Sequence, residues 1–95
     1  MMKVIGLIRV VDPAAFEQYR EQVGGTVSRY GGNIVFRGVR SMMPWNDLGC
    51  DEFEAYVELE FPNRTDAQRW ASSPEYTALL PIRSQAMRLT LFGVE

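Results

Sequence analysis

Three side chains in the middle of the chain are of types that could bind an anion and move a proton. Arg37 lies in one segment of alternating apolar residues, and Tyr56 and Glu58 lie in the next one. Side chains two residues apart in an extended strand point to the same face, so we expect all three on one face of a sheet. Arg37 could bind a carboxylate or an enolate there, while Tyr56 or Glu58 carries the proton.

The same face is expected to hold further charges, which leaves a purely structural role open. Arg9 and Arg88 lie in the first and last apolar segments, and Glu60 follows Glu58 by two residues. Ion pairs between neighbouring strands would satisfy such charges and fix the strand register without any chemistry. The charges therefore allow two interpretations, a ligand site and a set of mutually paired residues.

Three other residues are candidates for contact with a ligand. Arg83 is predicted at the end of the last helix, where a cation complements free carbonyl groups, and its side chain could also reach a cleft. Trp45 lies in a long loop of residues 41–52 with two methionines, either as a lid over a pocket or as an anchor on a partner subunit. Tyr30 ends the apolar face of the first predicted helix. We predict ligand contacts for Arg83, Trp45 and Tyr30.

Composition excludes several classes of site. The chain has no histidine and a single cysteine, Cys50, which excludes His-dependent triads, most zinc sites and an internal disulfide. A reducing cytoplasm is the expected compartment. A net charge of −2 gives no reason to expect nucleic acid, and the first apolar run is too short for a signal peptide or a membrane span. No glycine-rich loop follows a strand, and Asp47, Asp51 and Glu52 match no calcium loop, so we predict no cofactor and no metal.

Periodicity predicts the elements that position these residues. Alternating apolar side chains predict four strands, over residues 3–10, 34–40, 53–61 and 87–94. Asp12-Pro13 starts a first helix that runs to Tyr30, Asn63 caps a second, and Ser73-Pro74 starts a further turn of helix that Pro81 interrupts. The order β-α-β-β-α-β predicts a single α+β domain over residues 1–95, ferredoxin-like, with a four-stranded antiparallel sheet covered by helices on one face.

The uncovered face of that sheet is predicted to meet a second subunit. A chain of 95 residues buries only about 60% of its unfolded surface, yet 46% of its residues are hydrophobic. Ile5, Leu7, Val39 and Phe92 are all assigned to the uncovered face, together with Arg37. Two copies pairing sheet against sheet would remove this apolar surface from water, so we predict a homodimer through the sheet face.

A set of short motifs gives the chain a resemblance to a known family. These motifs are Tyr30-Gly31-Gly32, Arg37-Gly38, Glu60-Phe61-Pro62, Ala67 with Trp70, Ser73-Pro74-Glu75-Tyr76, and Arg83. In this order and spacing they resemble the family of domain of unknown function 1330. That family is similar to the dimeric α/β-barrel superfamily, so the resemblance implies two ferredoxin-like subunits paired through their sheets. Family members usually carry a Glu-Gly pair after the second strand, where this chain has Leu48-Gly49.

The resemblance implies a fold more directly than an activity. Superfamily members include cofactor-free monooxygenases and isomerases, which suggests a cofactor-free enzyme acting on a small organic acid or aromatic compound. The alternative is a non-catalytic dimer that binds a small ligand or serves as an accessory protein. An enclosed cavity that touches Arg37 and a carboxylate would favour the enzyme. Full mutual pairing of the charges without a cavity would favour the alternative.

Overall fold

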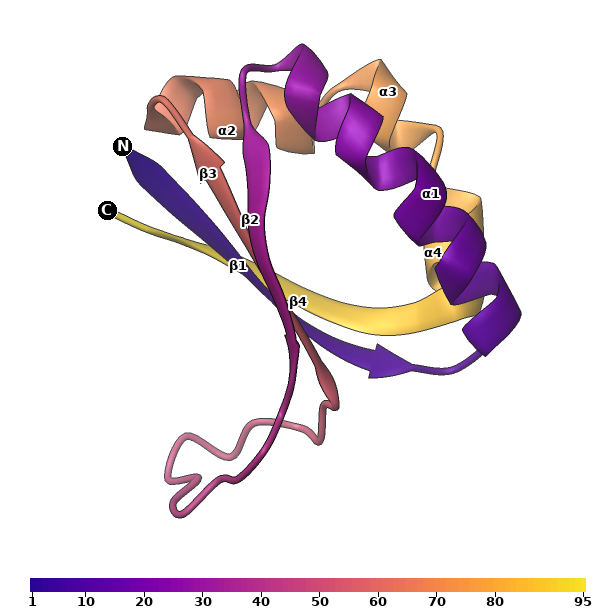
Figure 1. The fold of residues 1–95 in the computed structure, drawn as a ribbon, viewed down its shortest axis with the longest axis vertical. Helices are drawn as coiled ribbons and strands as arrows, with labels where there is room; N and C mark the ends of the chain where they lie inside the picture. The colour runs from indigo at the N-terminus through magenta and orange to yellow at the C-terminus, as the bar shows by residue number, and fades with distance from the viewer.

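The structure, a computed structural model, describes residues 1–95 as four strands and four helices. In chain order the elements are β1 (Met2–Val10), α1 (Pro13–Arg29), β2 (Asn33–Val39), β3 (Ala55–Phe61), α2 (Arg64–Ala71), α3 (Pro74–Thr77), α4 (Leu80–Ala86) and β4 (Met87–Val94). This is the predicted β-α-β-β-α-β order, with the second helical segment divided into three short helices (Figure 1).

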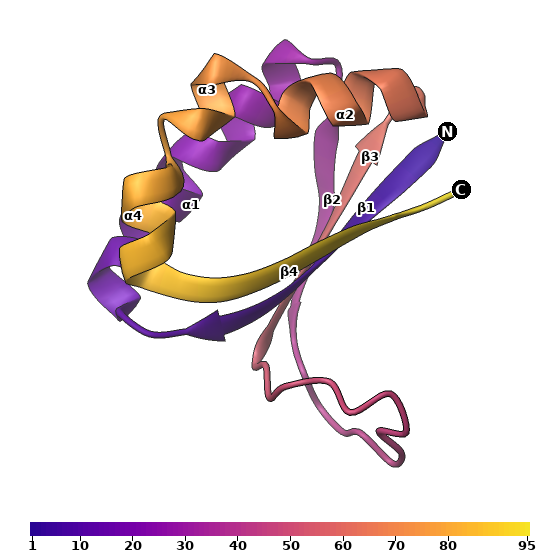
Figure 2. The same cartoon turned by 180° about the vertical axis from the view of Figure 1, so that it is seen from behind.

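The strands form one antiparallel sheet in the order β2-β3-β1-β4, so β1 and β3 are its central strands. All four helices cover the same face of this sheet, and the other face has no covering element in the chain (Figures 1 and 2). We call these the inner and outer faces. The α+β ferredoxin-like fold predicted from the sequence is therefore the observed one.

Local signals explain where the long elements begin and end. The Asp12 carboxylate accepts hydrogen bonds from the backbone N–H groups of Ala14 and Ala15 at the start of α1. Gly31 ends α1 with a φ of 80°, a conformation that residues with a Cβ adopt at a cost. The Asn63 side chain accepts from Asp66 N at 2.8 Å and caps α2.

The core lies between the helices and the inner face. Trp70 of α2 is 1% exposed, and its ring contacts Phe61 and Tyr76 at centroid distances of 5.5 and 4.6 Å. Its indole N–H donates to Thr26 Oγ1 at 3.0 Å, which satisfies the one polar group that the ring buries. Trp70 is therefore buried under its own helix.

Two element boundaries differ from the prediction. The strand predicted over residues 53–61 begins at Ala55, because Val10 N donates to the side chain of Glu54 rather than to a backbone carbonyl, and the regular ladder ends there. Pro81 lies in the first turn of α4, where backbone N–H groups have no acceptor within the helix, so its lack of an N–H breaks no hydrogen bond. The helical segment therefore continues past Pro81, contrary to the prediction.

The outer face retains apolar side chains without a cover. Ile5 and Leu7 of β1 are half-buried, and Phe36 and Phe92 are 55% and 45% exposed. None of the helices has the length and apolar content needed to cross a membrane.

Candidate functional site

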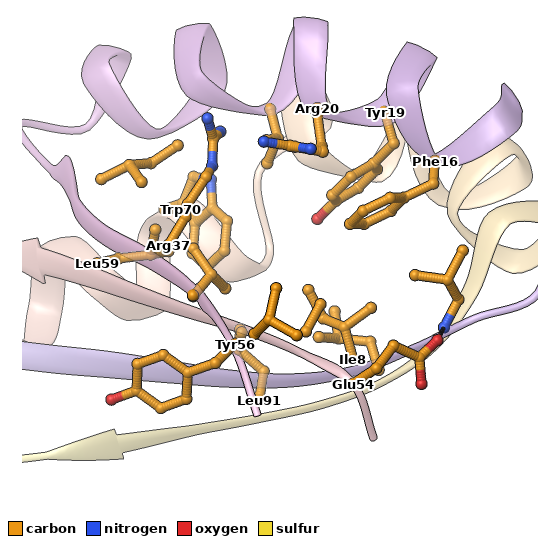
Figure 3. Close-up of a pocket in the computed structure, with 18 residues that line it drawn as sticks. Ile8, Phe16, Tyr19, Arg20, Arg37, Glu54, Tyr56, Leu59, Trp70 and Leu91 are labelled. Carbon is orange, nitrogen blue, oxygen red and sulfur yellow. Dashed lines mark hydrogen bonds between the residues drawn. The ribbon is translucent and has the colours of Figure 1, made fainter. Parts of the chain in front are cut away.

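A cavity of about 380 Å³ lies between α1 and the inner face of the sheet. We call it the α1 cavity. Its lining comprises 18 residues, of which 14 are hydrophobic. Phe16 and Tyr19 of α1 lie on one side, and strand residues such as Ile8 and Leu91 on the other (Figure 3). An apolar cavity of this size with a few polar groups is typical of small-molecule sites.

A β-bulge in β2 places Arg37 at this cavity. Ile34 pairs with Leu59 and Phe36 with Glu58, so Val35 is an extra residue without a partner in β3. Beyond the bulge the two faces exchange, and Arg37 lies opposite Val57 on the inner face. The prediction that Arg37 lies on the outer face is therefore wrong.

The same bulge also determines the faces on which two neighbours of Arg37 lie. Val39, assigned to the outer face, pairs with Ala55 and lines the α1 cavity. Phe36, which regular alternation from Ile34 would place on the inner face, lies on the outer face with its ring centre 5.9 Å from that of Tyr56.

Tyr56 and Glu58 lie on the outer face, as predicted, and are thereby separated from Arg37. The Tyr56 hydroxyl donates to Glu58 Oε2 at 3.1 Å, and Lys3 Nζ donates to Glu58 Oε1 at 2.6 Å. The hydrogen bond from Lys3, followed by that from Tyr56, lowers the pKa of Glu58. Figure 3 shows the Tyr56 ring on the far side of the sheet from Tyr19, although its backbone borders the cavity. These groups form a surface pairing network, and the predicted trio of Arg37, Tyr56 and Glu58 does not come together.

Arg37 has no ion pair or side-chain hydrogen bond within the chain, and its guanidinium extends from β2 toward α1 (Figure 3). Arg20 of α1 also lines the cavity, but its charge is shared with Glu17 at 2.9 Å and lies 5.5 Å from the Phe16 ring centre. The mouth of the cavity therefore carries one guanidinium that is free to bind an anion.

Glu54 is a carboxylate at the cavity, although regular strand alternation would place it with Tyr56 and Glu58 on the outer face. One oxygen, Oε1, accepts from Val10 N at 2.6 Å, which holds the side chain beside the end of β1. The residue lines the cavity across from Arg37 in Figure 3. Because Val10 N occupies Oε1, the second carboxylate oxygen is the one available to a ligand.

Tyr19 and Tyr76 connect the cavity to Arg83. The two tyrosine oxygens are 2.8 Å apart, and Arg83 Nη1 donates to the Tyr76 oxygen at 3.1 Å. Arg83 is half-buried and does not line the cavity, so it reaches the site only through the two tyrosines. Burial raises the pKa of Tyr19, so its hydroxyl keeps its proton.

The other two predicted ligand-binding residues lie away from the α1 cavity. The Tyr30 hydroxyl donates to Glu75 Oε1 at 2.6 Å and ties the end of α1 to α3. Trp45 is 82% exposed in the loop between β2 and β3, which projects from the sheet away from the helices (Figures 1 and 2). That loop is ordered by Asn46, whose side chain bonds to both backbone groups of Cys50 at 2.9 Å.

No group of three or more His, Cys, Asp or Glu side chains is placed to hold a metal ion.

The family model for a domain of unknown function, DUF1330, matches residues 4–95. The chain belongs to this family. A search among curated proteins found no significant match. Among solved structures, this DUF1330 chain is similar to a protein of unknown function from Rhodopseudomonas palustris, with a TM-score of 0.77 and 18% identity over 98% of this chain and 79% of that one.

Two further similar structures have names that state an activity. The cofactor-independent oxygenase SnoaB from Streptomyces nogalater has a TM-score of 0.68 and 12% identity, with 99% of the DUF1330 chain and 90% of SnoaB covered. A protein described as an antibiotic biosynthesis monooxygenase has a TM-score of 0.62 and 15% identity, with 100% and 97% covered. At these identities the similarity establishes the shared fold and leaves the activity open.

Sequence reasoning missed Glu54 and Tyr19 as members of the site in this DUF1330 chain. Glu54 fits the alternation of β3 and so looked like an outward charge, and Tyr19 fits the apolar face of α1 and so looked like core. Nothing in the sequence distinguishes Glu54 from the other charges of the predicted strand, because its position depends on the irregular pairing with β1. Nothing in the sequence distinguishes Tyr19 from its buried neighbours.

Proposed function

We propose that this DUF1330 chain binds a small aromatic or largely apolar organic acid in the α1 cavity. The observation that carries the proposal is the unpaired guanidinium of Arg37 at the edge of a largely apolar cavity of about 380 Å³. An apolar ligand body would displace water from the strand and helix side chains, while Arg37 binds the carboxylate through paired N–H groups.

The proposed reaction class is proton abstraction without a cofactor. The cavity touches both Arg37 and the carboxylate of Glu54, which supports an enzyme over a passive binding site, but it is open at its mouth rather than enclosed. The free oxygen of Glu54 takes a proton from an acidic carbon or hydroxyl of the substrate, and Arg37 stabilises the negative charge left on the substrate. The anion then either regains the proton at another carbon, which isomerises the substrate, or adds dioxygen as a second substrate, with the proton going to the new peroxide oxygen. The fold shared with a protein described as a cofactor-independent oxygenase is compatible with a reaction that needs no cofactor.

The alternative is a dimer that binds its ligand without changing it. Glu54 favours this alternative in one respect, because it is exposed and Val10 N already holds one of its oxygens. Conversion of the bound acid to a product would indicate the enzyme, and binding without conversion would indicate the non-catalytic dimer.

We also propose that two copies pair through the outer face. Phe36, Tyr56 and Phe92 leave aromatic surface on a face that no helix of the same chain covers. A second sheet would bury this surface and would leave the α1 cavity on the opposite side of each sheet accessible.

The test is a thermal-shift screen of small aromatic and aliphatic acids with wild type and Arg37→Ala. A ligand at 100 times its Kd stabilises the native state by about 2.7 kcal/mol, which raises Tm by roughly 10–20 °C in a domain of this size. Arg37→Ala is expected to lose this shift, whereas Arg64→Ala, which removes an exposed arginine at the start of α2, is expected to retain it. An unchanged shift in Arg37→Ala would remove Arg37 from the site.

Catalysis is tested on the acid that gives the largest shift. We expect its concentration to fall when it is incubated aerobically with wild type, and Glu54→Gln to stop this loss while changing the Kd by less than about twofold. Binding without any loss of the acid in wild type would favour the non-catalytic dimer.

A further inference from the structure

A chain of hydrogen bonds runs from the surface of α4 to the α1 cavity. Arg83 of α4 bonds to Tyr76 of α3 at 3.1 Å, and the Tyr76 oxygen lies 2.8 Å from the Tyr19 oxygen of α1. Tyr19 and Tyr76 are 7% and 4% exposed, so water has little access to either ring. The two rings meet edge to face with centroids 6.4 Å apart, which fixes their hydroxyl groups relative to each other.

The protons in this chain can be counted. A guanidinium has only donors, so the Tyr76 oxygen must accept from Arg83. The contact between the two tyrosines uses one of their two O–H protons. One O–H proton therefore remains without an acceptor in the chain, and it belongs to either Tyr19 or Tyr76.

Burial decides between the two positions. A proton left on Tyr76 would be enclosed, because Tyr76 does not line the cavity and its oxygen has no partner other than Tyr19 and Arg83. An unmade hydrogen bond in such a place is costly. A proton left on Tyr19 faces the α1 cavity, and Figure 3 shows the Tyr19 hydroxyl directed toward the space that Trp70 borders. The favoured arrangement has Arg83 donating to Tyr76, Tyr76 donating to Tyr19, and Tyr19 donating into the cavity.

We propose that Tyr19 is a ligand-binding residue that donates a hydrogen bond to an acceptor oxygen of the ligand, with Tyr76 and Arg83 as positioning residues. This inference rests on the proposed function, because it concerns the same cavity. It narrows the ligand class to a molecule with two oxygen-bearing ends, an anionic group for Arg37 and a carbonyl or similar acceptor for Tyr19.

The experiment uses probes that differ only in the acceptor. The probes are 3- and 4-acetylbenzoate, each compared with the isopropenylbenzoate of the same ring position, in which a methylene group replaces the carbonyl oxygen. Dissociation constants are measured by calorimetry for wild type, Tyr19→Phe and Arg37→Ala. The control is Tyr30→Phe, which removes a tyrosine hydroxyl that bonds to Glu75 outside the cavity.

Wild type is expected to bind at least one acetyl compound about fivefold more tightly than its isopropenyl counterpart, as one hydrogen bond contributes roughly 1 kcal/mol. Tyr19→Phe is expected to abolish that preference, Tyr30→Phe to retain it, and Arg37→Ala to weaken every probe. The preference in wild type is a test that does not depend on any variant folding.

Two outcomes overturn the inference. If wild type binds the isopropenyl compounds as tightly as the acetyl compounds, or if Tyr19→Phe keeps the preference, Tyr19 is not the donor, although the anion site at Arg37 stands. If wild type binds none of the four probes, the proposed function fails together with the inference.

Discussion

The homodimer proposed through the outer face depends most directly on Phe92. This side chain is 45% exposed in the single chain. A phenylalanine presents roughly 200 Å² of surface, so about 90 Å² remains in contact with water. Burying that area at about 25 cal/mol per Å² stabilises an interface by about 2 kcal/mol per copy, or about 4 kcal/mol when a two-fold axis buries both copies. Phe92→Asp removes this contribution and adds a charge, so we expect dimerisation to weaken at least about a thousandfold.

Sedimentation velocity over a range of protein concentrations measures this effect. The matched control is Val11→Asp, which also replaces an exposed apolar residue by a carboxylate, at the connection between β1 and α1 rather than on the outer face. We expect Val11→Asp to sediment as a dimer and Phe92→Asp as a monomer, with the same far-ultraviolet circular dichroism for both. Wild type that stays monomeric at high concentration, or Phe92→Asp that sediments like wild type, would refute the assignment of the outer face as the interface.

Two further predictions concern stability. Asn63→Ala removes the side-chain cap of α2 and is expected to lower the free energy of unfolding by about 1 kcal/mol in urea denaturation, whereas the exposed Gln68→Ala should have a smaller effect. The hydrogen bond from Tyr30 lowers the pKa of Glu75 below its ordinary value of 4.5, so this carboxylate stabilises the fold above that pH and loses its contribution as the pH falls through the lowered pKa. The urea midpoint of wild type should therefore exceed that of Glu75→Gln at neutral pH and approach it in acid, and a constant difference down to pH 2 would contradict the role of Glu75.

The fold could be predicted because its signals are local. Alternation in β1 and β3, the caps at Asp12 and Asn63, and the glycine after α1 each act within a few residues and agree with one another. The start of α4 was missed because Leu79 provides no capping side chain, and Pro81 is equally compatible with the end of one helix and the first turn of the next.

The site was predicted less well, because its composition depends on pairing between strands. Arg37 was selected for its chemistry, but its face depends on the extra residue Val35, and a β-branched residue in a strand gives no sign of a bulge. Glu58 was selected for the same reason as Arg37, and its pairing with Lys3 depends on the register between β1 and β3. The hydroxyl contact of Tyr19 involves a residue 57 positions away, which no local pattern encodes.

The bulge at Val35 also has a consequence for insertions and deletions in this family. Removing one residue from a regular strand turns every following side chain to the opposite surface. Removing Val35 would instead leave β2 in continuous register with β3, with Ile34 and Arg37 still directed toward the helices. Relatives that lack a residue at this position are therefore expected to keep the same cavity, whereas a gap within β3 would exchange its two surfaces.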